Sequence, residues 1–293
     1  MLASEAIRVP DNKRIAKGDP PPKEIDVEIQ KQGLDFPSPW NWKQFIARTN
    51  INYRYNGTKS IKDIWWLQTV QPFYTTGKYL TNTAFFQFRT IFRSGFTTFN
   101  TGLGYRYLTE NQRYLFGING FYDAYSRYAQ QRWSIGADFY TQWISIWGSY
   151  YDNILQWRHT GNSGTNILEQ RVTPGGELNA SAPFPYLPWL RIEAGFYIWD
   201  YLNARDALGY RVAGRVQITG PLFLEGGRTE DRYQENNFIR LSLNLGFPNF
   251  MEFTLLNTPV SKKVLPARTL KRFILDPIKR YNNIRFQRRT VTP

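Results

Sequence analysis

The sequence of 293 residues contains no cysteine and a single histidine, His159. Without cysteine, the chain can form neither disulfides nor thiolate metal sites. One histidine alone also supplies too few groups for a zinc site or for a serine–histidine–acid triad. We therefore expect no metal, no cofactor and no enzymatic activity, and we interpret His159 as an exposed residue of a long loop.

Long apolar runs are also missing. No window approaches the roughly 18 consecutive apolar residues that a transmembrane helix needs. The first residues, MLASEAIRVPDNKR, contain no apolar core of the kind found in secretory signal peptides. If this protein spans a membrane, it must do so as a closed β-barrel, because only helices and closed barrels satisfy every backbone group in lipid. Export would then need a signal peptide that this sequence does not include.

Acidic residues are few relative to basic ones, with 23 Asp and Glu against 37 Lys and Arg, so that the formal net charge is +14. This charge is compatible with nucleic-acid binding, with attraction to anionic lipid or lipopolysaccharide, or with a basic pore or tail. Aromatic residues, in contrast, make up 17% of the chain. Such a content is typical of barrels that carry a girdle of aromatic side chains at each membrane interface.

Strict alternation of apolar and polar residues is clearest between Thr101 and Tyr140, which read TGLGYRYLTENQRYLFGINGFYDAYSRYAQQRWSIGADFY. In its first run, Leu103 and Tyr105 fall on one face and Gly104 and Arg106 fall on the other. A period of two predicts a β-strand. Because the second face consists of glycine, asparagine and arginine, the pattern favours a barrel with an apolar outside and a hydrated inside.

Twelve such runs follow one another along the chain. We predict strands over 44–55, 61–71, 80–93, 96–108, 112–122, 130–141, 143–152, 172–182, 188–199, 208–219, 221–229 and 236–247. The predicted fold is all-β, a twelve-stranded antiparallel transmembrane β-barrel over residues 41–250, with a C-terminal linker or short helix in or near its pore. A polar, proline-rich tail on the periplasmic side precedes it (1–40), and a basic linker follows it (251–293).

The predicted connections alternate in length. Those after even-numbered strands are short, at 109–111, 142, 183–187 and 220, apart from 73–78. Several after odd-numbered strands are longer, at 123–129, 153–171, 200–207 and 230–235. Outer-membrane barrels have short periplasmic turns and longer external loops. With an even number of strands, this asymmetry places both ends of the barrel on the periplasmic side.

The predicted inward faces carry a series of charged side chains that we expect to line the lumen. They are Arg48, Arg89, Arg106, Arg132, Asp138, Glu177, Arg191, Glu193, Arg211, Arg215, Glu225 and Arg240. In a dry β core such charges would cost several kcal/mol each, which favours a hydrated pore over a sandwich. Asp123, Glu230 and Asp231 fall near the bases of external loops, and we interpret them as solvated charges rather than as catalytic carboxylates.

The segment after the last predicted strand is strongly basic, and residues 262–289 contain a single acid, Asp276. Residues 266–274 predict a short helix with a proline in its first turn. Either this is a solvated tail, or it re-enters the barrel, in which case Leu265, Arg268, Lys271, Arg272 and Phe273 would form a pore linker. A basic lumen does not attract a basic segment, and only the acids at 138, 177, 193 and 225 would offset that repulsion.

Four pieces in register resemble the transport domain of the inverse autotransporters, the intimin/invasin group. They are GLGYR from Gly102, GINGFYD from Gly117, an arginine followed by IGADFY from Arg132 to Tyr140, and GGELNASAPFPYLP from Gly175. The resemblance covers residues 40–250, and YNNIRF from Tyr281 is similar to the linker of that family. It implies a twelve-stranded outer-membrane barrel whose linker passes outward through the pore, with a short helix, and carries an adhesive passenger.

This sequence ends at Pro293 without such a passenger and has no peptidoglycan-binding module before the barrel. We therefore expect an outer-membrane translocator that anchors and exports its own C-terminal segment. The alternatives are a stand-alone channel or structural barrel and, less favoured, a soluble basic β protein that binds glycans or nucleic acid. As partners of a monomeric barrel we expect outer-membrane lipid, lipopolysaccharide and, during insertion, the barrel-assembly machinery, but no nucleic acid.

Overall fold

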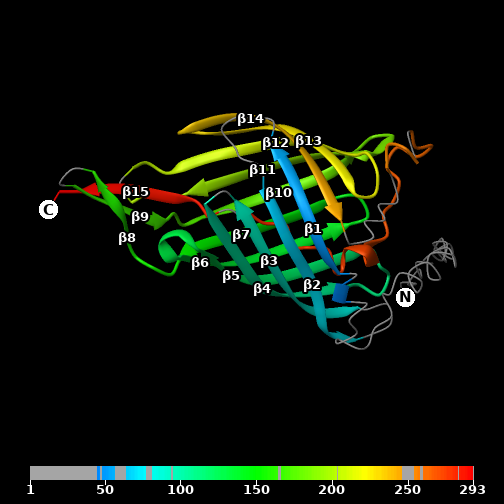
Figure 1. Ribbon diagram of the computed structural model, residues 1–293. Coiled ribbons are helices and arrows are strands. Elements are labelled where there is room, and N and C mark those ends of the chain that lie inside the picture. Colours follow the sequence, from blue (N-terminus) through cyan, green and yellow to red (C-terminus); the bar gives the residue numbers. More distant parts are fainter. Residues whose placement is uncertain are drawn as a thin grey trace, which may run out of the picture. The chain divides into compact units, whose positions relative to one another are not determined.

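The computed structural model describes residues 45–46, 48–56, 64–76, 81–93, 95–163, 166–202, 204–245, 254–257, 260–282 and 284–292 (Figure 1). All of them belong to the compact unit Phe36–Pro293. The predicted tail over 1–40 and the predicted end of the last strand at Phe247 lie outside the described residues. No helix in the described part of the chain is long and apolar enough to cross a membrane.

Twelve of the described strands form a closed barrel in which each strand pairs with two neighbours. Around the barrel, the order is β1, β14, β13, β12, β11, β10, β7, β6, β5, β4, β3 and β2. The bounds are β1 Thr49–Asn56, β2 Ile64–Thr76, β3 Asn82–Arg93, β4 Phe96–Leu108, β5 Tyr114–Tyr125, β6 Gln130–Thr141, β7 Ser145–Asn153, β10 Gly175–Phe184, β11 Leu187–Trp199, β12 Ala207–Gln217, β13 Leu222–Asp231 and β14 Gln234–Leu245. Every pairing is antiparallel, and β1 closes the barrel against β14.

Burial alternates along the barrel strands with the period of two that the sequence predicts. In β4, Asn100 and Arg106 are fully buried, whereas Leu103 between them is 61% exposed. The same contrast recurs around the barrel, so that large apolar side chains cover its outer surface. Those with more than half of their surface exposed include Leu103, Ile118, Ile135, Leu178, Phe196, Leu208 and Ile239. An apolar outer face and a polar inner face are the pattern of a barrel in lipid.

Aromatic side chains on the outer face lie near both ends of the strands. Tyr107 and Tyr114 flank the turn that joins β4 to β5, and Tyr122 lies near the opposite end of β5. Tyr122 is directly opposite Trp133 of β6, whose ring contacts that of Tyr150. These side chains bracket the apolar belt, as aromatic girdles do at the two membrane interfaces.

A second sheet of three strands corrects the predicted long loop over 153–171. Within it lie β8 (Arg158–Ser163) and β9 (Asn166–Val172), which form a hairpin, and His159 is an exposed residue of β8. The third strand is β15 (Phe286–Val291), which pairs antiparallel with β9. Figure 1 shows this sheet beyond one end of the barrel. The sequence of β9, NILEQRV, lacks strict alternation, and its partner β15 lies more than a hundred residues away, so its pairing could not be seen locally.

Other differences concern the ends of elements. β2 continues to Thr76 instead of stopping at residue 71, and this removes the predicted loop from 73 to 76. The predicted helix over 266–274 is reduced to one 3₁₀ turn, η2 (Leu270–Phe273). Thr269 before it is extended, and the wall side chain Arg106 binds the carbonyls of Phe273 and Ile274. Because the barrel satisfies these backbone groups, the segment need not form a longer helix.

Candidate functional site: the occupied lumen

The C-terminal segment, defined here as residues 260–282 and 284–285, follows the inside of the barrel from one end to the other. Its first contacts are with the short turns. The Tyr186 amide donates to the Val264 carbonyl at 2.8 Å, and the Trp143 indole donates to the Leu265 carbonyl at 3.1 Å. Leu265 itself remains 43% exposed. The segment therefore begins at the end of the barrel where consecutive strands are joined by short turns.

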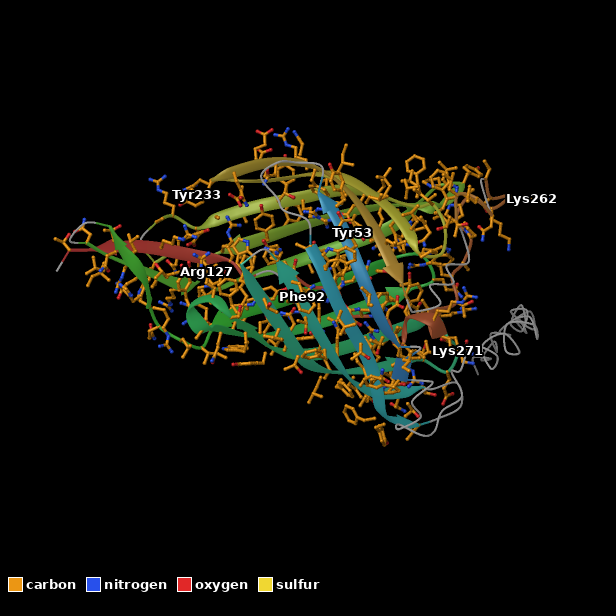
Figure 2. The ribbon with its side chains drawn as sticks, in the orientation of Figure 1. Tyr53, Phe92, Arg127, Tyr233, Lys262 and Lys271 are labelled. Carbon is orange, nitrogen blue, oxygen red and sulfur yellow. The ribbon has the colours of Figure 1, made fainter. Side chains whose placement is uncertain are left out.

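Arg268 fixes the segment to the turn between β6 and β7. Its amide donates to the Gln142 carbonyl at 3.1 Å. Its guanidinium donates to the carbonyls of Thr141 and Trp143 and to the Ser145 hydroxyl, at 3.0 to 3.3 Å. An arginine carries five donors in one rigid plane, which allows a single side chain to satisfy the several acceptors of a turn. Lys271 and Arg272 follow in η2, both half-buried, and Figure 2 shows Lys271 at the same end as Lys262.

Arg106, near the short-turn end of β4, holds the segment inside the lumen. One of its terminal nitrogens, Nη1, donates to the carbonyls of Phe273, Ile274 and Asp276 at 2.5, 3.1 and 2.7 Å. Its other terminal nitrogen lies 3.0 Å from Asp138, and both side chains are almost completely buried. The wall thus supplies a neutralised arginine whose remaining donors face the backbone of the segment.

Apolar side chains of the segment fill the space around this arginine. Leu270, Ile274, Leu275 and Ile278 are each at most 6% exposed. Phe273 stacks on Tyr140 of β6, with ring centroids 5.5 Å apart. Burying such a side chain fully stabilises the folded state by about 1.5–3 kcal/mol. These side chains therefore bind the segment to the barrel, and together they occupy the lumen.

Further along, adjacent residues of the segment contact opposite walls. The Ile278 amide donates to Gln87 of β3 at 2.8 Å. The Lys279 ammonium lies 3.3 Å from Glu193 of β11 and 4.3 Å from the centre of the Trp147 ring. Arg280 instead contacts β5. This alternation is expected of an extended chain, because successive side chains point in opposite directions.

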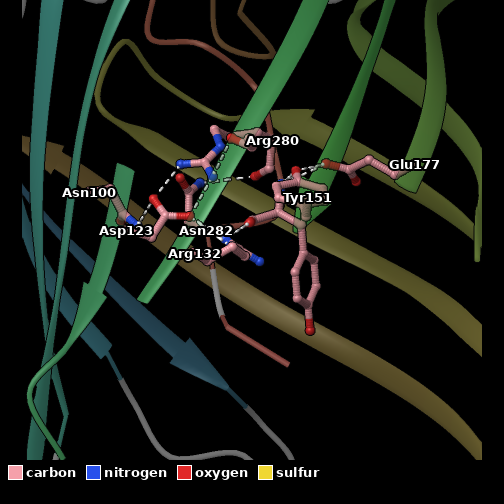
Figure 3. A network of polar contacts seen from close by, with 9 residues as sticks. Asn100, Asp123, Arg132, Tyr151, Glu177, Arg280 and Asn282 are labelled. Carbon is pink, nitrogen blue, oxygen red and sulfur yellow. Dashed lines mark hydrogen bonds and ion pairs between the residues drawn. The ribbon is translucent and has the colours of Figure 1, made fainter. Parts of the chain in front are cut away.

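Arg280 and Asp123 form the centre of a buried polar network, which Figure 3 shows from close by. Nη1 and Nη2 of Arg280 donate to the two carboxylate oxygens of Asp123 at 2.8 and 2.6 Å. Asp123 also accepts hydrogen bonds from Asn100 at 2.7 Å and from Arg132 at 2.8 Å. The Asp123, Arg132 and Arg280 side chains are all 0% exposed. Two parallel N–H···O bonds to one carboxylate are among the strongest and most directional polar contacts in proteins.

The segment leaves the barrel at the end with the long connections. The Tyr281 amide donates to the Tyr151 hydroxyl at 2.7 Å and to Glu177 at 2.6 Å. Arg285 donates to the Tyr201 hydroxyl and to Asp231, at 2.9 and 3.0 Å. β15 follows directly and pairs with β9. The contacts of the segment thus run in order from the short turns to the long loops.

The predicted lumen residues divide into two groups by what they contact. Arg106, Arg132, Glu177 and Glu193 contact the segment. Others contact the wall: Arg48 binds Gln71, Arg89 binds Gln68, Arg191 binds Ser181, Arg211 and Arg240 bind Glu225, Asp138 binds Arg106, and Arg215 lies over the Phe223 ring.

Asp123 and Asp231 are not the solvated loop charges that the sequence indicated. Asp123 lies in β5, which runs to Tyr125 rather than ending at residue 122. Its side chain, like that of Asp231 at the end of β13, is 0% exposed. The sequence did contain a signal for this burial: the alternation of inward and outward residues continues beyond Phe121 and places Asp123 on the inner face. Glu230, by contrast, is on the outer side and pairs with Arg228, which is 44% exposed.

The structure also explains why a basic segment and a basic lumen coexist. Several wall arginines are neutralised by wall acids, as in the pairs of Arg106 with Asp138 and of Arg211 with Glu225. Spare donors of the wall bind carbonyl groups of the segment, which are acceptors whatever its net charge. Basic residues of the segment form ion pairs with other wall acids, namely Glu193, Asp123 and Asp231. Among the described residues, no group of three or more potential ligands is arranged to hold a metal ion.

An antiparallel barrel of twelve strands, apolar outside and polar inside, has the architecture of an outer-membrane β-barrel. The sequence matches the family described as inverse autotransporter, beta-domain, over residues 41–282. The chain belongs to this family, and it is therefore an outer-membrane barrel of a type V secretion family. The match extends past the barrel and includes most of the segment in the lumen.

Solved structures with a similar fold are membrane barrels. A chain from work on the mechanism of in-meso crystallization of membrane proteins superposes with a TM-score of 0.66 at 16% identity, covering 82% of this chain and 99% of that chain. An outer membrane channel from Pseudomonas putida F1 is similar at 14% identity, with 67% and 92% coverage and a TM-score of 0.46. The KdgM porin is similar at 8% identity, with 67% and 97% coverage and a TM-score of 0.39.

Proposed function

We propose that this chain is an outer-membrane translocator that anchors and exports its own C-terminal segment, without enzymatic activity. The observation that carries the proposal is the order of contacts along the segment. Leu265 and Arg268 bind the short turns, Ile274 binds Arg106 of the wall, Arg280 binds Asp123 toward the long-connection end of β5, and β15 pairs with β9 of a long connection. In outer-membrane barrels, short turns face the periplasm and long loops face outward.

In this proposal the barrel acts as a scaffold with a polar inner surface. An extended chain that crosses a membrane must have its backbone groups satisfied. Gln87, Arg106, Arg132 and Tyr151 do this by binding amides and carbonyls rather than particular side chains. A wall of this kind suits the passage of different sequences, whereas the buried apolar side chains of residues 270–278 hold the final segment in place.

A protease-accessible epitope tag fused after Pro293 tests the proposal. On intact cells, we expect external protease to remove the tag while the barrel remains intact. A periplasmic protein serves as the control for outer-membrane integrity and must remain uncut. If the tag is cut only after the outer membrane has been permeabilised, the segment is not exported.

That second outcome would favour a stand-alone channel or structural barrel with a periplasmic tail. The occupied lumen argues against an open channel, because the apolar side chains of Leu270, Ile274 and Ile278 are buried inside it. We propose outer-membrane lipid, lipopolysaccharide and the barrel-assembly machinery as partners. The aromatic residues near both ends of the outer face support the first of these, since such girdles lie at the headgroups.

A further inference from the structure

The bidentate pair of Arg280 with Asp123 differs in kind from the other contacts in the lumen. Several wall side chains that touch the segment bind its backbone, as Gln87, Arg106 and Arg132 do. Backbone groups repeat at every residue, so these contacts would be available at several positions of a passing chain. A contact with a particular side chain, in contrast, is available at one position only.

Asp123 is prepared for this contact by the barrel wall alone. Asn100 of β4 and Arg132 of β6 donate to it from the two neighbouring strands, which fixes the orientation of its carboxylate. The Arg280 guanidinium then lies 4.3 Å from the centre of the Phe121 ring, and Ser134 accepts a further hydrogen bond from it at 3.0 Å. The planar cation thus has a carboxylate at its edge and an aromatic ring at its face, an arrangement that suits arginine better than lysine.

The neighbouring residue makes a second specific contact. Lys279 pairs with Glu193 on the opposite wall, although its side chain is 33% exposed in that ion pair. The fully buried Arg280 pair is therefore the stronger discriminator, and the lysine pair adds to it. Asp123 and Glu193, on two sides of the lumen, thus bind the side chains of two adjacent basic residues.

We propose that Asp123 is the residue that sets the register of the exported segment, by capturing the arginine at position 280. The inference rests on the proposed function, since it names the recognition that stops the segment at its final position. With Arg280 in place, β15 meets β9 with Thr290 opposite Leu168. A shift of β15 by two residues along β9 would keep each side chain on the same face of the sheet. The Asp123–Arg280 pair must exclude this alternative register.

The register can be measured by disulfide crosslinking, because the chain has no cysteine of its own. Thr290→Cys is combined with Leu168→Cys to report the native register. Combination with Asn166→Cys or with Gln170→Cys reports slips of two residues outward or inward. Crosslinks are formed with a mild oxidant in the full-length protein in outer membranes, and folding of each barrel is checked by its heat-dependent mobility on gels.

Arg280→Gln is the test variant, since it lies on the segment and leaves the wall unchanged. We expect the ratio of native to slipped crosslinks to fall by about tenfold, because hydrogen bonds to charged groups are of that strength. Arg280→Lys should lower it by less, since it retains the charge but not the paired donors. Arg288→Gln is the matched control: it also removes one arginine from β15, but this arginine is exposed and lies opposite Gln170 rather than an acid, and the ratio should not change.

Asp123→Asn gives an independent check. If Asp123 and Arg280 set the register only through their mutual contact, the double variant Asp123→Asn with Arg280→Gln will lower the ratio of native to slipped crosslinks no further than the single variants do. Additive losses, or an unchanged ratio in Arg280→Gln, would overturn the proposal. The tag after Pro293 separates this result from the proposed function. If the tag is exposed and the register is unchanged in Arg280→Gln, only the role of Asp123 in setting the register is overturned. If the tag is never exposed, the proposed export is overturned.

Discussion

At the scale of single residues, an arginine in the lumen can have its charge balanced by an acid and still donate hydrogen bonds to other groups. Arg106 illustrates this, because Asp138 balances its charge while its remaining donors bind the segment. The cost of a buried charge is high, and removing one partner of a buried pair leaves the other uncompensated. Arg106 and Arg132 are therefore coupled both to wall acids and to the segment.

Arg106→Met is expected to destabilise the protein by about 3–5 kcal/mol, the usual cost of breaking a buried ion pair. It leaves Asp138 buried without its partner and removes the donors to three segment carbonyls. The free energy of unfolding can be measured by urea titration in lipid vesicles. Arg228→Met is the control, since its ion pair is exposed and such pairs contribute little to stability. Equal losses in both variants would contradict this account of Arg106.

Gly117 leaves the space that the Arg106–Asp138 pair occupies. A Cβ atom at this position would lie 2.1 Å from Asp138 Oδ1 and 3.1 Å from Arg106 Cγ. Gly117→Ala should therefore displace the pair and cost about 1–3 kcal/mol, as overpacking does. Gly120→Ala on the same strand is the matched control, because the nearest atom would be 3.8 Å away. The comparison again uses urea unfolding, and similar stabilities of the two variants would count against the packing argument.

At the scale of elements, the hairpin β8–β9 is an addition to the barrel rather than part of it. β7 pairs directly with β10, and Tyr151 lies opposite Gly175, so the chain could close here without the hairpin. Its pairing with β15 joins the strand that follows the segment to a long connection of the barrel. Sheet pairing is independent of side-chain identity at most positions, which suits a holding contact.

Replacing residues 158–172 by a short glycine–serine linker is expected to leave the barrel folded and to release β15. Trypsin should then cut after Arg288 and Arg289 several times faster, because a strand that loses its partner opens readily. The heat-dependent gel mobility of the barrel should remain as in the unaltered protein. Cleavage at an unchanged rate would mean that β15 is held by something other than β9.

How much of this could be predicted from the sequence depends on whether the signal is local. β4 and β6 were predicted with their observed bounds, because an apolar face in lipid and a polar inner face give strict alternation over their whole length. β15 was missed because its partner lies far away in the sequence, and β9 was missed because it lacks strict alternation, although it also pairs with the adjacent β8. For the same reason Arg106 could be placed inside, whereas the pairing of Asp123 with Arg280 required the structure.

At the scale of the whole molecule, the account rests on one claim: the chain returns through its own barrel and ends on the side of the long connections. The barrel wall, the neutralised arginines and the strand β15 are consistent parts of that path. Figure 2 shows Lys262 at one end of the barrel and Tyr233 and Arg127 at the other. Lys263 and Thr292, both exposed, therefore belong to opposite ends of the path.

Single cysteines at these two positions test the claim most directly, because the unaltered chain has none. Intact cells that carry Lys263→Cys or Thr292→Cys are treated with a maleimide that cannot cross the outer membrane. We predict that Thr292→Cys is labelled on intact cells, and that Lys263→Cys is labelled only after the outer membrane has been permeabilised. Labelling of Lys263→Cys but not of Thr292→Cys on intact cells, or of neither position until permeabilisation, would contradict the path.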